Sequence, residues 1–415
     1  MSNKFNEINS CEVCGNTDLN SVLDLGLHPM CDDLVQVDDS RICNEYPIEI
    51  LFCKNCTTAH QHFQVPKEEL FPNSYHYRSR FTADVLKGME GLVDSCADRF
   101  GSLSGKKVLD IGCNDGSLLD FFKRQGAITI GIEPTGAFTD AKEKGHIAYN
   151  NYLSEDVAEK IVASRGKPDF ITFTNVFAHI EDLQEVLRSL KILMAKNTTI
   201  VIENHYLGSV LGGNQFDTFY HEHPRTYSYK SFVHMARSLE TQLSDVEFPS
   251  RYGGNIRVFM GNALNSSQDA VVDLKNLELK ESKFFDDFSL LRKNVDSWGE
   301  VKKVFLQEQF EKYGKLRAKA FPGRAAILVK LLGLDEKLIS AVYEKPGSLK
   351  IGHYLPGTRI PICSDEELFA LSDQTIPLIN LAWHIPVEIR NYLTEHDYTG
   401  DIIDILSLND FSSGK

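Results

Sequence analysis

The stretch Lys106-Lys107-Val108-Leu109-Asp110-Ile111-Gly112-Cys113-Asn114-Asp115-Gly116 decides the fold of this 415-residue chain. It starts as a buried strand and runs into a glycine-rich turn, and helical spacing follows over residues 116–124. Further strands are expected at 127–133, 169–175 and 198–203, with a helix over 183–194. This alternation predicts an α/β fold with a doubly wound, Rossmann-like sheet, which binds ligands at the carboxyl ends of its strands.

The glycine turn indicates the kind of ligand. Its spacing, Gly112-x-x-x-Gly116, differs from the G-x-G-x-x-G pattern of dinucleotide-binding folds. Carboxylates at the turn suit a cation such as S-adenosylmethionine and would repel a pyrophosphate, and Glu133 ends the next strand, where it is placed to accept both ribose hydroxyls. We therefore expect a methyltransferase and not a nicotinamide enzyme. The expected cofactor-binding residues are Asp110, Gly112, Asn114, Asp115, Gly116, Glu133, Thr174 and Asn175.

Two CxxC pairs near the N-terminus predict a structural zinc site. Four of the nine cysteines, Cys11, Cys14, Cys53 and Cys56, form two knuckles of matching spacing. Each knuckle points two sulfurs at one centre, and four thiolates make the closed tetrahedral set that zinc prefers. A catalytic zinc is not expected, because four sulfurs leave no open position. The alternative is a chance spacing of buried thiols.

Composition limits the remaining possibilities. A net charge of −14 argues against non-specific binding to nucleic acid or anionic membranes. No apolar run approaches the roughly 20 residues that span a bilayer, and residues 1–7 contain no secretory signal, so we expect a cytoplasmic protein. Composition shifts predict three domains: a zinc-binding domain (1–75), a cofactor domain (76–262) and a C-terminal α/β domain (263–415). The sequence does not indicate the oligomeric state.

Nine residues, Gln215-Phe216-Asp217-Thr218-Phe219-Tyr220-His221-Glu222-His223, hold two carboxylates, two histidines and a phenol, and we call them the polar segment. If it is extended, His221 and His223 share a face; if it is a helical turn, Tyr220 and His223 do. Beside a cofactor fold, such a cluster indicates general-base chemistry, with either histidine as the base. The alternative from a different class is a metal-dependent lyase or hydrolase with His221, Glu222 and His223 as ligands.

These motifs resemble those of the S-adenosylmethionine-dependent sugar C-methyltransferases of deoxysugar and branched-sugar biosynthesis. The resemblance covers nearly the whole chain. It rests on the four cysteines, the DIGCNDG turn, the FDTxYHEH stretch over 216–223, Gly253-Gly254 with Arg257, Leu355-Pro356-Gly357-Thr358 and Leu381-Ala382-Trp383.

The resemblance implies a reaction and a substrate. The family methylates the carbon next to the ketone of a nucleotide-linked 4-keto sugar, commonly C3. The resemblance implies that this substrate binds between the last two domains. It implies His223 as the base with Tyr220 and Glu222 beside it, and His221 stays the alternative base. The substrate contacts that we expect are Tyr75, Tyr77, Asn204 and Arg257. Methylation of a sugar oxygen or nitrogen, and a zinc-bearing binding protein with an inactive cofactor fold, are further alternatives.

Two segments depart from the family pattern. Aromatic residues usually follow the HEH, where this chain has Pro224-Arg225-Thr226-Tyr227. A glycine- and lysine-containing turn usually opens the C-terminal domain, where this chain has Phe321-Pro322-Gly323-Arg324. We expect both changes on the substrate side, where they bear on the nucleotide and the sugar.

Overall fold

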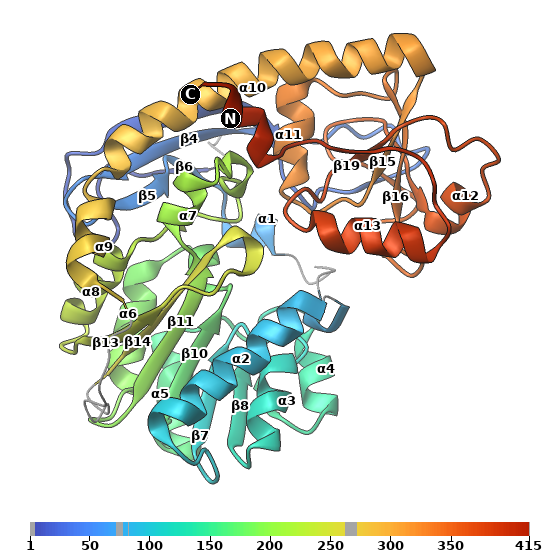
Figure 1. Ribbon diagram of the computed structural model, residues 1–415. Helices are drawn as coiled ribbons and strands as arrows, with labels where there is room; N and C mark the ends of the chain where they lie inside the picture. The colour runs from blue at the N-terminus through green and yellow to red at the C-terminus, as the bar shows by residue number, and fades with distance from the viewer. Residues whose placement is uncertain (1–4, 72–77, 82, 262–271, 415) are drawn as a thin grey trace.

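A computed structural model describes residues 5–71, 78–81, 83–261 and 272–414 (Figure 1). A seven-stranded sheet forms the centre, as the alternating pattern predicts, and only β14 runs antiparallel to its neighbours. The α/β, doubly wound fold is therefore confirmed. In spatial order the strands are β13 (Leu243–Glu247), β14 (Asn255–Met260), β11 (Thr199–His205), β10 (Phe170–Thr174), β7 (Lys107–Ile111), β8 (Ile128–Ile132) and β9 (Ile147–Tyr149).

Helices cover both faces of this sheet, because its strands are apolar on both sides. Val108 packs with α2 and α3, whereas the next residue, Leu109, packs with α5 and α6 on the other face. The first face is covered by α2 (Ala83–Phe100), α3 (Ser117–Arg124) and α4 (Phe138–Glu143), and the second by α5 (Glu155–Arg165), α6 (Leu183–Leu193) and α8 (Tyr229–Ser238).

A small antiparallel sheet carries the four N-terminal cysteines. Its order is β12-β5-β4-β2, with β2 (Asn20–Pro29), β4 (Glu45–Cys53), β5 (Thr58–Gln61) and β12 (Arg225–Thr226). We call described residues 5–71 the zinc unit. Strand β12 lies directly after the polar segment in sequence, so the central part of the chain supplies an edge strand to the zinc unit.

The C-terminal part is a second α/β sheet of five parallel strands. Their order is β18 (Ile362–Ser364), β16 (Ile339–Glu344), β15 (Leu316–Lys319), β19 (Leu378–Asn380) and β20 (Ile402–Asp404). The helix α11 (Ala325–Leu332) follows β15 in the chain. Figure 1 shows the long helix α10 (Phe284–Tyr313) running from the zinc unit to this sheet.

Described residues 316–414, which we call the C-terminal unit, also contact the zinc unit. Strand β17 (His353–Tyr354) pairs with β3 (Val35–Gln36), and the Arg359 guanidinium donates to three carbonyl oxygens in residues 39–41. No helix among the described residues is long and apolar enough to cross a membrane.

Candidate active site

The polar segment folds as a short helix and a turn, not as a strand. Residues Phe216–Thr218 form the 3-10 helix η3, and the His223 amide donates to the Tyr220 carbonyl at 2.8 Å. This turn brings the rings of Tyr220 and His223 to a centroid distance of 4.2 Å. The helical-turn alternative is therefore confirmed and the extended one is wrong. We call residues 220–223 the histidine turn.

The ring of His223 is held in one protonation form. Its Nδ1 lies 2.9 Å from the Thr218 carbonyl oxygen, which can only accept, so Nδ1 carries the proton and Nε2 the lone pair. Burial lowers the pKa of His223 well below its usual value, and the neighbouring His179 and His205 lower it further. At neutral pH the ring is therefore uncharged, with Nε2 as its basic nitrogen.

Two more histidines surround His223, and the sequence reasoning missed both. The ring centroid of His179 lies 4.7 Å from that of His223, and the ring centroid of His205 lies 5.4 Å away. His179 closely follows β10 and His205 ends β11. Their position at the carboxyl ends of adjacent strands was the available signal. Burial is the main cause that lowers the pKa of His179 to about 4 and of His205 to about 3.

His221 does not join this cluster through its side chain. His221 Nε2 lies 3.1 Å from the carbonyl oxygen of Tyr46 in the zinc unit, so the ring faces that unit. The main-chain carbonyl of Glu222 accepts from His179 Nδ1 at 2.7 Å. Burial, with a smaller contribution from the charge of Glu222, raises the pKa of the Cys31 thiol. The backbone carbonyl of Thr218 therefore orients the ring of His223.

The glycine turn is shaped for a close ligand. Gly112 has φ +71°, and a Cβ there would lie 2.6 Å from Val176. Burial, with a smaller contribution from the charge of Glu133, raises the pKa of Asp110 to about 7, while a hydrogen bond from Thr172 opposes the shift. Thr174 Oγ1 is buried and has no hydrogen-bond partner among the described residues. A raised carboxyl pKa and an unpaired hydroxyl fit a cationic cofactor such as S-adenosylmethionine.

Other residues of the predicted cofactor set are already engaged with the protein. Glu133 accepts from the Asn114 amide and from the amide and hydroxyl of Thr135, so the ribose would share its oxygens with three donors. Asp115 is fully buried and accepts from Ser117 Oγ at 2.6 Å and from the Arg80 amide at 3.0 Å. Its role in the structure is to hold the turn and the segment before α2. Gly116 (φ +75°) and Asn175 (φ +54°) both take the left-handed conformation.

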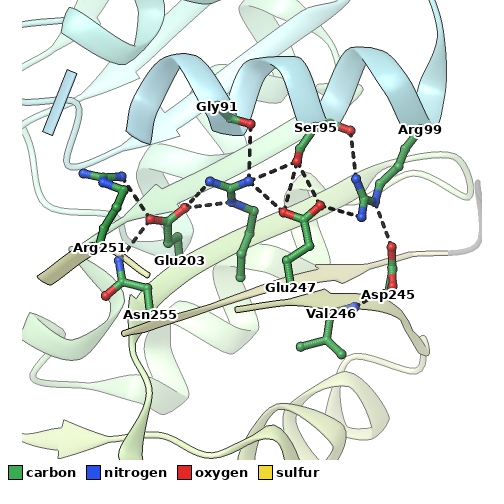
Figure 2. A network of polar contacts seen from close by, with 10 residues as sticks. Gly91, Ser95, Arg99, Glu203, Asp245, Val246, Glu247, Arg251 and Asn255 are labelled. Atoms are coloured by element: carbon green, nitrogen blue, oxygen red, sulfur yellow. Dashed lines mark hydrogen bonds and ion pairs between the residues drawn. The ribbon is translucent and has the colours of Figure 1, made fainter. Parts of the chain in front are cut away.

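Arg257 is not placed for substrate binding. It lies in a polar network between β11, β13, β14 and α2, and Figure 2 shows its partners Glu203, Glu247 and Ser95 in that network. Its guanidinium bonds to Glu203 at 2.7 Å and to Glu247 at 2.7 Å, and also to Ser95. The expectation for Arg257 is therefore corrected: these partners use the guanidinium to fasten α2 to the sheet.

The other expected substrate contacts differ in outcome. Asn204 is buried, and neither amide atom has a hydrogen-bond partner among the described residues. Leaving a buried amide unpaired is unfavourable, so Asn204 suits a ligand-binding role. Tyr75 and Tyr77 lie outside the described residues.

The cysteines meet as predicted. Cys11 Sγ lies 3.3 Å from Cys56 Sγ and Cys14 Sγ lies 3.6 Å from Cys53 Sγ, with all four sulfurs within 4.8 Å of one another. Tetrahedral zinc, with Zn–S near 2.3 Å, requires sulfur separations of about 3.8 Å. The four cysteines thus fit a closed, structural zinc site.

Arg225 belongs to the surroundings of this zinc site and not to a substrate surface. It is fully buried, with NH1 2.6 Å from the Glu12 carboxylate, which also lies 3.5 Å from His60 Nδ1. His60 Nε2 in turn lies 3.3 Å from Cys11 Sγ. Residues beyond the direct ligands commonly orient a metal site in this way. The expected substrate role of the segment after the HEH is therefore corrected for Arg225.

Three family models match consecutive parts of the chain: a zinc binding domain over residues 11–71, a methyltransferase domain over 81–246 and a C-methyltransferase C-terminal domain over 250–403. C-methyltransferase NovU of Streptomyces niveus is 27% identical over 398 residues, which cover 94% of this chain and 93% of that protein. Ubiquinone biosynthesis O-methyltransferase of Escherichia fergusonii is 38% identical over 98 residues, 22% of this chain and 40% of that protein.

Solved structures match a smaller part. The PH0226 protein from Pyrococcus horikoshii OT3 is 12% identical with a TM-score of 0.36, and the match covers 47% of this chain and 97% of that one. Magnesium protoporphyrin IX methyltransferase from Synechocystis PCC 6803 is 16% identical with a TM-score of 0.32, covering 43% of this chain and 79% of that one.

Proposed function

Because this chain belongs to the S-adenosylmethionine-dependent C-methyltransferases with an N-terminal zinc-binding domain, we propose that it methylates the carbon next to the ketone of a nucleotide-linked 4-keto sugar, at C3. The observation that carries the proposal is the 2.9 Å bond between His223 Nδ1 and the Thr218 carbonyl. It presents a neutral imidazole with one basic nitrogen, which proton removal from carbon requires.

In the proposed reaction, His223 Nε2 removes the proton of the carbon next to the ketone, and the electron pair moves onto the ketone oxygen as an enolate. Tyr220, whose ring contacts that of His223, donates its hydroxyl hydrogen bond to this oxygen. When bound, S-adenosylmethionine supplies the methyl group as an activated electrophile for the resulting carbon nucleophile. His223 leaves this step as an imidazolium, and burial favours its return to the neutral form.

Stabilisation of the enolate must supply much of the decrease in the activation barrier, because a histidine with a lowered pKa is a weak base. Asn204, with its unpaired amide, is the second donor that we assign to the substrate. Orientation of base and substrate supplies further rate. This division of roles makes Tyr220 and Asn204 as necessary to the proposal as His223 itself.

The C-terminal sheet supports a nucleotide-linked substrate. Its order, β18-β16-β15-β19-β20, changes direction between β15 and β19, and such a switch point is where doubly wound sheets bind ligands. Arg324 follows β15, and His384 follows β19 with its buried Nδ1 unpaired among the described residues. Burial is the main cause that lowers the pKa of His205 and His384, and the charge of Arg324 lowers both further. Arg324 NH2 also donates to Thr218 Oγ1 at 2.8 Å, so this edge of the sheet lies beside the histidine cluster.

The alternatives have less support. Among the described residues, the four cysteines are the one group arranged to hold a metal ion, so nothing favours a metal-dependent lyase or hydrolase using the HEH residues. Methylation of oxygen or nitrogen is not supported either, since both the C-terminal family model and the relative that spans the chain are C-methyltransferases.

The test combines a substrate screen with isotope exchange. A panel of nucleotide-linked 4-keto-6-deoxy sugars is incubated with labelled methyl donor, and the product is located by NMR. The accepted sugar is then placed in deuterated water without methyl donor, where wild type should exchange the C3 proton and His223→Gln should not. His223→Gln should still bind S-adenosylmethionine in calorimetry. Methylation without any exchange by wild type would exclude the enolate route.

A further inference from the structure

The carboxylate of Asp217 joins the polar segment to the C-terminal unit. Asp217 is fully buried in η3, and its two oxygens accept from Arg324 Nε at 2.8 Å and Arg324 NH2 at 2.5 Å. Trp383 Nε1 also donates to Asp217, at 2.8 Å. We call Asp217, Arg324 and Trp383 the Asp217 clamp.

The clamp acts on the group that holds the histidine. Arg324 NH2 donates at 2.8 Å to Thr218 Oγ1, and the carbonyl of the same Thr218 accepts from His223 Nδ1. Two hydrogen bonds to Thr218 therefore connect the Arg324 guanidinium of the C-terminal unit with the His223 imidazole of the histidine turn. The side chain that departs from the family pattern at residue 324 lies at the origin of this path.

The chemistry of the clamp favours a positioning role. Two parallel hydrogen bonds between a guanidinium and a carboxylate fix the relative orientation of the two groups. The ammonium group of a lysine could not fix it in this way. A buried ion pair adds little net stability compared with an apolar replacement, because both charges lose their hydration. Its benefit here is geometric, since Asp217 is covered by three donors that come from two separate loops of the C-terminal sheet.

We propose that Arg324 and Trp383, acting through Asp217 and Thr218, are positioning residues that fix the orientation and tautomer of His223 from the C-terminal unit. The base would then be correctly oriented only when the C-terminal unit is docked on the central one. This inference rests on the proposed role of His223 as the base. It adds that the unit expected to hold the nucleotide also sets the geometry of proton removal.

The direct test is ¹⁵N NMR of the full-length, zinc-bound protein labelled at histidine, with His223→Gln used to assign the signals of His223. In wild type, one nitrogen of His223 should show the shift of a protonated nitrogen and the other that of an unprotonated one. In Arg324→Met and Asp217→Asn the two signals should move toward each other as both tautomers become populated. Unchanged signals in both variants would overturn the proposal.

Kinetics supply a second readout, with the sugar accepted in the substrate screen. Arg324→Met should lower the maximal rate of C3 deuterium exchange by 10- to 100-fold with a smaller change in KM, since small misplacements of a base carry penalties of this size. Trp383→Phe removes the indole N–H donor to Asp217 and keeps an aromatic ring at this position, so it should lower the maximal exchange rate by an intermediate amount. Arg324→Lys should recover only part of the rate.

The matched control is Asp365→Asn, which breaks a buried ion pair with Lys319 (2.9 Å) in the same C-terminal sheet. Among the described residues, no hydrogen bond joins the Asp365 side chain to the histidine turn. This variant should leave both the His223 signals and the maximal exchange rate near wild type. An equal loss in Asp365→Asn and Arg324→Met would mean a merely structural role. If His223→Gln exchanges normally, the proposed function fails; if only the clamp variants behave as wild type, this inference alone fails.

Discussion

Replacing Asp110 by Asn should stabilise the cofactor-free protein while removing cofactor binding. Burial raises the pKa of Asp110 from 3.8 to about 7, so folding takes up a proton in this interval. Stability from this group is therefore lost as pH rises from about 4 to 7, and the full penalty, about 4 kcal/mol at 1.36 kcal/mol per unit, applies above pH 7. Asparagine is neutral, and its Oδ1 can still accept the bond from Thr172.

The assay is calorimetric melting at pH 5 to 8 with and without S-adenosylmethionine. Asp110→Asn should melt about 10 °C above wild type at pH 8 and only a few degrees above it at pH 5. The cofactor should raise the melting temperature of wild type alone. Asp94→Asn, at an exposed position of α2, is the control and should change little. A variant that is no more stable than wild type at pH 8, or a difference independent of pH, would refute the reasoning.

Three further predictions concern the surrounding structure. Chelation of zinc should unfold the zinc unit and, through β12, increase hydrogen exchange in the histidine turn; peptides of that turn that stay protected would contradict this. Glu203→Gln should lower the unfolding free energy by about 3 kcal/mol in denaturant titration, since it leaves buried guanidinium groups underpaired, and a loss below about 1 kcal/mol would count against the network. Gly88→Ala should destabilise, because a Cβ would lie 1.4 Å from Arg251 NH1 and this guanidinium is held by Glu203 and the Val85 carbonyl. Gly91→Ala on the same helix has open space and should be neutral or stabilising by up to about 1 kcal/mol in thermal melts.

Local patterns predicted the parts of the site that depend on short spacing. Two knuckles point their sulfurs at one centre whatever lies between them, so the zinc ligands followed from the sequence and meet in the structure. Gly112 and Gly116 take the positive φ that the turn requires, and the alternation of strands and helices predicted the sheet around them.

Side-chain direction and long-range pairing could not be read in this way. The backbone turn at residues 220–223 directs His221 toward Tyr46 and His223 toward His179. The spacing of the two histidines alone was compatible with both rings facing the same side or opposite sides. Arg257 matched a family motif, yet whether an arginine meets a substrate or a buried carboxylate depends on which strands are neighbours.

The sequence by itself thus determined the fold class, the zinc ligands, the glycine turn and the segment that holds His223, because each is marked by a short local sequence pattern. The tertiary structure alone decided which residues surround His223: His179 and His205 from adjacent strand ends, and Arg324 from a domain about a hundred positions further along the chain. Such neighbours are set by strand order and domain docking, which are properties of the packed molecule and leave no periodic mark on the local sequence.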